Sequence, residues 1–145
     1  MSYKQPRSVQ VVLFTEGEEY LLLRRVDSHG GFWQFVTGSV EGEETHLQTA
    51  VRETFEETGI VCRESDLIDL HLINRFEISP LWIGKYAPGV THNEEVCFAL
   101  RVEKRAIRLD TVEHTDYIWV DYQSAMRMLH WESNRKALEA TREKI

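Results

Sequence analysis

Residues 38–60 read GSVEGEETHLQTAVRETFEETGI, and they contain the clearest helix signal of the chain. Thr45 and Gln48 have the spacing of a capping box, in which each side chain satisfies a backbone N–H group of the other residue at the start of a helix. Gly59 stands where helices commonly end in a left-handed residue. The spacing therefore predicts a helix from Thr45 to Thr58.

This helix is predicted to have two different faces. Glu53, Glu56 and Glu57 are three and four residues apart, so they share one face. The remaining face can pack on a sheet, and its residues are Leu47, Ala50, Val51, Thr54 and Phe55. Arg52 precedes Glu56 by four residues, which brings its guanidinium within reach of that carboxylate for a charge-assisted hydrogen bond.

The three glutamates repel one another, at a cost of roughly a few tenths of a kcal/mol for each i,i+4 pair. A hard divalent cation reverses this effect, because Mg²⁺ takes oxygen ligands and keeps several waters for contact with a substrate. Taken alone, however, Glu-x-x-Glu-Glu more often marks an acidic face that is simply solvated. The residues that flank the helix are needed to distinguish a metal site from a solvated acidic face.

Strand patterns surround the helix. β-branched and apolar runs, bounded by turn signals, predict strands at 8–15, 19–26 and 32–36, from position 67, at 94–102 and at 117–120. The first two look like a hairpin. The chain from Tyr122 is expected to be helical in two pieces, with Ser133 or Asn134 capping the second. Strands mixed with two or three helices predict an α/β (α+β) fold with helices packed on the faces of a sheet.

Composition places the chain among ordinary globular proteins. Its 145 residues are 42% hydrophobic and 28% charged, so we expect one domain over 1–145. We find no apolar run of membrane-spanning length and no apolar core of a signal peptide at the N-terminus, and we expect no membrane association and a cytoplasmic protein. Cys62 and Cys97 lack the spacing of a metal or redox motif, so we expect two reduced thiols.

The net charge of −7 argues against binding of a nucleic-acid polymer, which normally requires a basic patch. An acidic protein can still bind a small polyphosphate when divalent cations lie between the two sets of negative charges. The charge therefore favours a metal site and a small phosphorylated partner. The sequence leaves monomer and homodimer equally open.

The spacing around the helix makes the glutamate face specific. Gly38 is followed after five residues by Glu44, and after seven more by the stretch 52–57, which ends just before Thr58-Gly59-Ile60. The segment 38–60 resembles the Nudix box, and every fixed residue of the box is present. Thr54 is the one departure, because the family usually has an aliphatic residue there. Since Thr54 is on the predicted packing face, this departure concerns packing rather than metal chemistry.

The resemblance implies the Nudix fold, an α/β/α sandwich with a mixed central β-sheet and a loop–helix–loop catalytic motif. It also implies hydrolysis of a phosphoanhydride bond with Mg²⁺, for which Mn²⁺ can substitute. The implied metal ligands are Glu53, Glu57, Glu56, Glu113 and the carbonyl of Gly38, with Glu56 either a ligand or a holder of the ligands. The implied catalytic residues are Glu53, Glu56, Glu57, Glu113 and Arg52. The base is either a box glutamate or Glu113, whose other interpretation is an ordinary loop acid.

Segments outside the box resemble one Nudix subfamily, which converts dihydroneopterin triphosphate to the monophosphate and pyrophosphate in folate biosynthesis. These segments are 3–4, 32–34, 36–40, 85–91, 93–94, 131 and 133–135. The resemblance implies substrate contacts by Lys4, Arg25, Thr37, Phe76, Glu77 and Ile78. Lys4 and Arg25 are equally compatible with surface cations, and Phe76 and Ile78 with core positions.

Residues 75–86 depart from that subfamily by being less basic. Trp82 in this stretch is either a stacking platform for a flat heterocycle or a core or lid residue. His92 and His114 lack metal-ligand spacing, so neither receives a role. Two other functions remain open. One is a pyrophosphatase for nucleoside triphosphates or dinucleoside polyphosphates, as in cleaning of the nucleotide pool. The other is a non-catalytic Nudix-like domain that binds a ligand, although such a domain is expected to have lost box glutamates.

Overall fold

The structure is a computed structural model that describes residues 3–145. The first two residues of the N-terminus, where no signal peptide was expected, lie outside the described residues. Its strands are β1 (Arg7–Phe14), β2 (Tyr20–Arg25), β3 (Trp33–Gln34), β4 (Val36–Ser39), β5 (Leu67–Glu77), β6 (His92–Arg101) and β7 (His114–Val120). Its α-helices are α1 (His46–Thr58), α2 (Tyr122–Met128) and α3 (Glu132–Lys144). Short 3-10 helices cover Asp27–His29, Glu64–Asp66 and Ile83–Lys85. No helix in the described part of the chain is long and apolar enough to cross a membrane.

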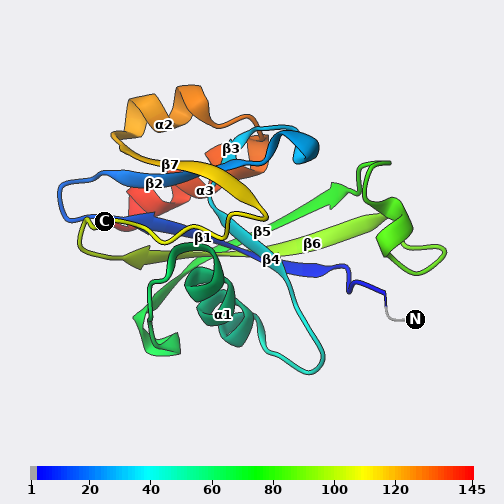
Figure 1. The fold of residues 1–145 in the computed structure, drawn as a ribbon. Helices are drawn as coiled ribbons and strands as arrows, with labels where there is room; N and C mark the ends of the chain where they lie inside the picture. Colours follow the sequence, from blue (N-terminus) through cyan, green and yellow to red (C-terminus); the bar gives the residue numbers. More distant parts are fainter. Residues whose placement is uncertain (1–2) are drawn as a thin grey trace.

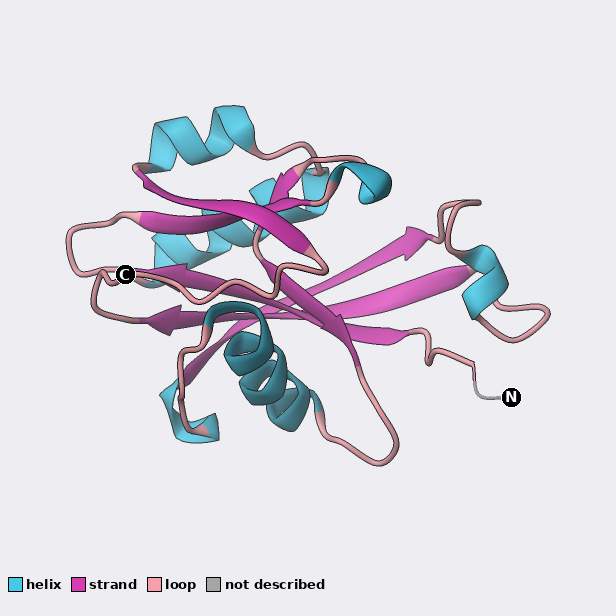
Figure 2. Cartoon of the chain, viewed as in Figure 1, coloured by secondary structure: helices cyan, strands magenta, loops and turns pink. Residues whose placement is uncertain are grey.

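The strands form one sheet in the order β3-β2-β1-β6-β5, with β4 also paired to β1 and β7 to β2. β1 and β6 are parallel, whereas the other pairs are antiparallel, so the sheet is mixed. Helix α1 covers one face, and α2 and α3 cover the other (Figures 1 and 2). This arrangement confirms the α/β/α sandwich that the sequence predicted.

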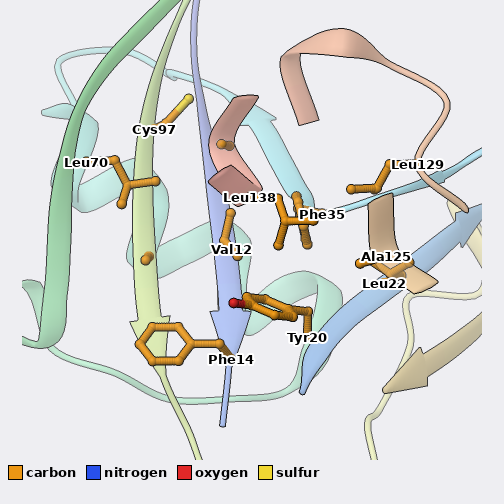
Figure 3. Close-up of a cluster of buried hydrophobic side chains, with 12 residues drawn as sticks. Val12, Phe14, Tyr20, Leu22, Phe35, Leu70, Cys97, Ala125, Leu129 and Leu138 are labelled. Carbon is orange, nitrogen blue, oxygen red and sulfur yellow. The ribbon is translucent and has the colours of Figure 1, made fainter. Parts of the chain in front are cut away.

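Each face of the sheet has its own core, because side chains alternate along β1. Val12 and Phe14 point to the side of α3, where Figure 3 shows them clustered with Tyr20 and Leu138. The intervening apolar residues of β1 belong to the cluster beneath α1, and they are Val9, Val11 and Leu13. All five are at most 3% exposed, and burial of such a side chain contributes roughly 1.5–3 kcal/mol.

β1 changes its neighbour along its length. It pairs with β4 over residues 8–11 but with β2 through Phe14 and Tyr20, while the rest of β2 pairs with β7. The predicted hairpin is therefore confirmed as an antiparallel pair only near its turn. The predicted strand at 32–36 is two strands, of which β4 continues to Ser39. This exchange of partners places Thr37 and Gly38 beside the first half of β1.

Helix α1 has the predicted ends. The Thr45 side chain accepts from the Gln48 backbone N–H at 3.1 Å, the Gln48 side chain accepts from the Thr45 backbone N–H at 2.9 Å, and Gly59 is left-handed. Thr54 is fully buried, as its place on the packing face predicted. Phe55 does not pack on the sheet. It is 43% exposed, and the Arg108 guanidinium lies over its ring, 5.1 Å from the ring centre.

Helix α2 begins at Tyr122 as predicted, whereas α3 begins earlier than the cap prediction. α3 starts at Glu132 with Trp131 at the N-cap position, so Ser133 and Asn134 lie in its first turn. The prediction of a side-chain cap there was wrong because the Asn134 amide is used elsewhere: it donates to Gln10 of β1 at 2.6 Å. Cys62 and Cys97 do not form a disulfide.

Candidate active site

A cavity of about 660 Å³ brings together nearly all of the sequence-predicted site residues. Its lining includes Lys4, Arg25, Thr37, Gly38, Arg52, Glu53, Glu56, Phe76, Glu77, Ile78 and Glu113. Glu57 is the one predicted residue that is not in the lining, because it is buried. A more open hollow of about 780 Å³ around Gly17, Cys62 and Arg101 contains none of these residues.

Arg52 holds the acidic residues of the box in place. Its Nε and Nη2 donate to the two carboxylate oxygens of Glu44 at 2.8 and 3.0 Å, and Nη2 also donates to the Ser39 carbonyl at 3.0 Å. Its Nη1 donates to Glu53 at 3.1 Å and to Glu56 at 3.2 Å, as the i,i+4 spacing predicted for Glu56. The Arg52 hydrogen bonds lower the pKa of Glu44 to about 2. The guanidinium therefore ties the loop before α1 to the acidic face of α1.

Gly38 leaves room for Glu53. A side-chain carbon at Gly38 would overlap the carboxyl end of Glu53, so this position requires glycine for space rather than for a positive φ. The Glu53 side chain is only 13% exposed. Burial, and then its hydrogen bond with Glu56, raises the pKa of Glu53 to about 8, although Arg52 acts in the opposite direction.

Glu57 is the most enclosed carboxylate of the box. It is 2% exposed, and neither oxygen has a hydrogen bond of good geometry from a described residue, although the Thr37 backbone N–H is near enough to lower its pKa somewhat. Burial raises its pKa well above the usual range, and Glu53 and Glu113 add to this effect. Its neighbour is His114, whose Nε2 lies 3.7 Å from Oε1 of Glu57. Burial, and then Arg25, lowers the pKa of His114 to about 4, so this imidazole is neutral at neutral pH.

These residues fit a hard divalent cation. A buried carboxylate that is not fully hydrogen-bonded costs free energy unless something positive compensates it, and oxygen ligands are those that Mg²⁺-class cations prefer. Within residues 3–145, no three histidine, cysteine or acidic side chains are already gathered around one point. Glu53 and Glu56 are instead turned toward Arg52, so they would have to reorient to bind a metal.

Basic side chains line the same cavity as the carboxylates. Arg25 Nη1 is 3.7 Å from Glu113 Oε2, and the Glu113 carbonyl accepts from the Val26 N–H, which fixes the loop before β7. Lys4 is held by the hydrogen bond from its backbone N–H to the Lys85 carbonyl at 2.8 Å. Burial, and then Lys85, lowers the pKa of Lys4. Cationic side chains and carboxylates in one cavity suit a polyphosphate bound through metal.

Aromatic rings and buried polar groups form the rest of the lining. The rings are Phe32, Phe76, Trp82, Tyr86 and Trp131, and the polar residues include Ser8, Asn93, Glu95 and Asn134. The ring of Phe32 packs edge to face against that of Trp131, with 5.5 Å between the ring centres. Trp82, which the sequence left between platform, core and lid, lies in the lining with Lys85 Nζ 4.6 Å from the centre of its ring.

Sequence reasoning missed the buried polar residues and His114. Their signal was weak but present, since a serine and a glutamine interrupt the apolar strand that begins at Arg7, and two of the polar residues alternate along β6. Only the pairing of β1, β5 and β6 shows that these positions share one face.

Comparison with known proteins gives a consistent result. The NUDIX domain family model matches residues 4–141. The dihydroneopterin triphosphate diphosphatase of Haemophilus influenzae is 37% identical over 141 residues, which cover 96% of this chain and 89% of that protein. The protein of the same name from Escherichia coli K12 is 39% identical, with 94% and 92% covered. The solved structure of the E. coli dihydroneopterin triphosphate pyrophosphohydrolase superposes with a TM-score of 0.87 and 38% identity over 100% of both chains.

Proposed function

The chain belongs to the Nudix family, and from that premise we propose that it hydrolyses dihydroneopterin triphosphate to the monophosphate and pyrophosphate with Mg²⁺. One observation carries the proposal: a single cavity joins the box carboxylates, cationic side chains and aromatic walls. A triphosphate attached to a flat ring system needs all three. The near full-length similarity to enzymes named for this substrate supports the same choice.

The metal would be held by Glu53, Glu57 and Glu113, with Glu56 and the Gly38 carbonyl as further ligands. When bound, the metal stabilises charge that develops on phosphate oxygens and lowers the pKa of water. Mn²⁺ has the same preference for oxygen ligands and would substitute.

The protein itself supplies positioning and proton transfer. Lys4 and Arg25 bind phosphate oxygens, and Thr37 lies beside them on β4. A carboxylate accepts the proton of the attacking water, and this base is either Glu113 or a glutamate of the box. Arg52 acts through the glutamates, because its Nη1 donates to both Glu53 and Glu56 on one side of α1.

The ring system of the substrate would lie against the aromatic part of the lining. Flat heterocycles stack favourably on aromatic side chains, and Phe76 and Trp82 offer such surfaces beside the cations. Glu77 and Ile78 follow Phe76 along the chain and complete this side of the cavity.

The proposal is tested by release of pyrophosphate from dihydroneopterin triphosphate, with and without Mg²⁺, beside a panel of purine deoxynucleoside triphosphates. We expect Mg²⁺-dependent pyrophosphate release and a clear preference for the pterin. Release of orthophosphate would contradict the proposal that the bond cleaved is the one that frees pyrophosphate. Comparable turnover of the deoxynucleotides would contradict the narrow substrate and favour a nucleotide pyrophosphatase, and absence of any hydrolysis would favour a ligand-binding domain.

A further inference from the structure

A group of polar side chains is buried at the part of the cavity beneath α3. We refer to Gln10, Asn74, Glu95 and Asn134 as the inner polar cluster. They come from β1, β5, β6 and α3, and each is at most 8% exposed. Glu95 and Asn134 line the same cavity as the box glutamates. The cluster therefore places an acid and three amides at a site where the surrounding strands are otherwise apolar.

Hydrogen bonding fixes the direction in which each amide of the cluster points. Oε1 of Glu95 accepts from Gln10 Nε2 at 3.0 Å and from Asn74 Nδ2 at 3.2 Å. Because a carboxylate only accepts, Gln10 must present its NH₂ group to Glu95 and its oxygen to the other side. That oxygen accepts from Asn134 Nδ2 at 2.6 Å. The chain of donors thus runs from Asn134 through Gln10 to Glu95.

The cluster leaves acceptors unused. Oε2 of Glu95 receives no hydrogen bond from any described residue. Oδ1 of Asn134 is buried without a partner. So is Oδ1 of the neighbouring Asn93, whose Nδ2 donates to Ser8 Oγ at 2.7 Å. Buried polar groups are normally hydrogen-bonded, so two buried acceptors without partners, together with the Glu95 oxygen that accepts no hydrogen bond, indicate a ligand that brings donors to this part of the cavity.

A purely structural role does not account for Glu95. Its accepted hydrogen bonds could equally be made by the amide oxygen of a glutamine, without the cost of burying an acid. Burial raises the pKa of Glu95 to about 7, although the hydrogen bonds from Asn74 and Gln10 act in the opposite direction. A carboxylate binds better than an amide at this position only when a ligand donates a hydrogen bond to the second oxygen, Oε2.

Resting on the function proposed above, we infer that Glu95, with Asn93 and Asn134, recognises the donor edge of a fused 2-amino-4-oxopyrimidine ring. This edge presents an amino group beside a ring N–H, which matches neighbouring acceptors. Dihydropterin and guanine both have the edge. Adenine lacks the ring N–H, and a 2-oxo ring replaces the amino donor by an acceptor. The cluster thus sets specificity at the ring, while the box glutamates act on the phosphates.

The test uses neopterin, the ring system without phosphates, in a fluorescence titration without metal. We expect Glu95→Gln to weaken neopterin binding by at least about tenfold, because an amide NH₂ would face the donors of the ligand. Glu94→Gln is the matched control, because Glu94 is the adjacent, exposed residue of the same strand, and it should bind as the unchanged protein does. Equal binding by the Glu95 and Glu94 variants would overturn the inference.

A second measurement needs no variant. On the unchanged protein, a 2-oxo pteridine should displace neopterin at least about tenfold less well than a 2-amino pteridine, because sites built to accept a donor reject analogues that lack it. Equal displacement would overturn the inference even if Glu95→Gln failed to fold. If guanosine displaces neopterin as effectively as a pterin does, recognition of the donor edge would be supported. The same result would contradict a preference of the site for pterins over purines.

These assays involve no hydrolysis, so they separate the two proposals. Suppose that Glu95→Gln loses neopterin binding and that the unchanged protein releases no pyrophosphate. Ring recognition by Glu95 would then be supported, and the proposed reaction would be contradicted. Pyrophosphate release that Glu95→Gln leaves unchanged, with unchanged neopterin binding, would retain the reaction and contradict this role of Glu95.

Discussion

Thr54, which replaces the aliphatic residue usual in the family, puts a hydroxyl group into the packed face of α1. Its side chain is fully buried in α1, and Oγ1 has no hydrogen-bond partner among the described residues. Thr58, one turn later, is also buried, but its Oγ1 donates to the Thr54 carbonyl at 2.6 Å and accepts from the Ile60 N–H at 3.1 Å. The Thr54 hydroxyl is therefore expected to lower the stability of the fold, whereas the Thr58 hydroxyl is expected to raise it.

We expect Thr54→Val to raise the free energy of unfolding by about 0.5–2 kcal/mol, because it removes an unsatisfied buried hydroxyl without changing side-chain volume much. Urea denaturation measures this change. Thr58→Val is the matched control and should lower stability by about 1 kcal/mol or more, since it leaves the Ile60 N–H unsatisfied. A Thr54 variant no more stable than the unchanged protein would show that Oγ1 has a partner in solution.

Between elements, Arg52 joins the loop before α1 to the helix, and Glu44 is its strongest partner. The folded-state pKa of Glu44, about 2, lies below its ordinary value of 4.5. Its contribution to stability is therefore present above pH 4.5 and is lost as the pH falls toward 2.

We expect Glu44→Gln to lower the free energy of unfolding at pH 6 by about 1–2 kcal/mol, because a charge-assisted pair is replaced by a neutral one. The difference between variant and unchanged protein should shrink between pH 4.5 and 2. Denaturant titrations across this range measure it. A difference that stays constant with pH would show that the ionised carboxylate is not what Arg52 requires.

Strand β4 and helix α1 meet at Gly38 and Glu53, where no space is left for a side chain on β4. We expect Gly38→Ala to displace the Glu53 carboxylate and to raise the Mg²⁺ concentration needed for half-maximal activity by roughly tenfold or more. Activity against Mg²⁺ concentration measures this. Gly17→Ala is the control, because the nearest atom to its new methyl group is 4.0 Å away. Unchanged Mg²⁺ dependence in the Gly38 variant would contradict the role of this close approach.

At the scale of the whole molecule, the metal site would connect elements that are far apart in the sequence. Glu57 lies on α1, whereas Glu113 comes much later in the chain, just before β7. The net charge of −7 and the enclosed carboxylates both disfavour the folded state without a cation. A ligand that binds only the folded state stabilises it by mass action, so Mg²⁺ should raise the melting temperature.

We expect Glu57→Gln to reduce turnover by at least about 100-fold and to abolish the rise in melting temperature with Mg²⁺. In metal-free buffer the variant should be as stable as the unchanged protein or more stable, because it removes an unpaired buried acid. Differential scanning fluorimetry and pyrophosphate release measure these effects. The control is Glu143→Gln on the exposed end of α3, which should change neither. A Glu57 variant with unchanged turnover would refute the metal role.

Features that depend on neighbours along the chain could be predicted from the residues alone. The ends of α1 follow from Thr45, Gln48 and Gly59, because capping is a local interaction. The shared face of the box glutamates follows from helical spacing, and the contact between Arg52 and Glu56 follows from the same rule. The family and its layered fold could be predicted because the box is itself one contiguous segment, whereas the predicted lining residues outside the box came from the resemblance of further segments to one subfamily.

Features that depend on which strands meet required the folded structure. β1 exchanges β4 for β2 along its length, and this pairing fixes the place of Gly38. Glu57 is enclosed against His114, a residue distant in the sequence. Glu95 meets Gln10 and Asn74 because β6 lies between β1 and β5. Side-chain periodicity reports which face a residue occupies but not what lies opposite it, so these contacts had to come from the fold.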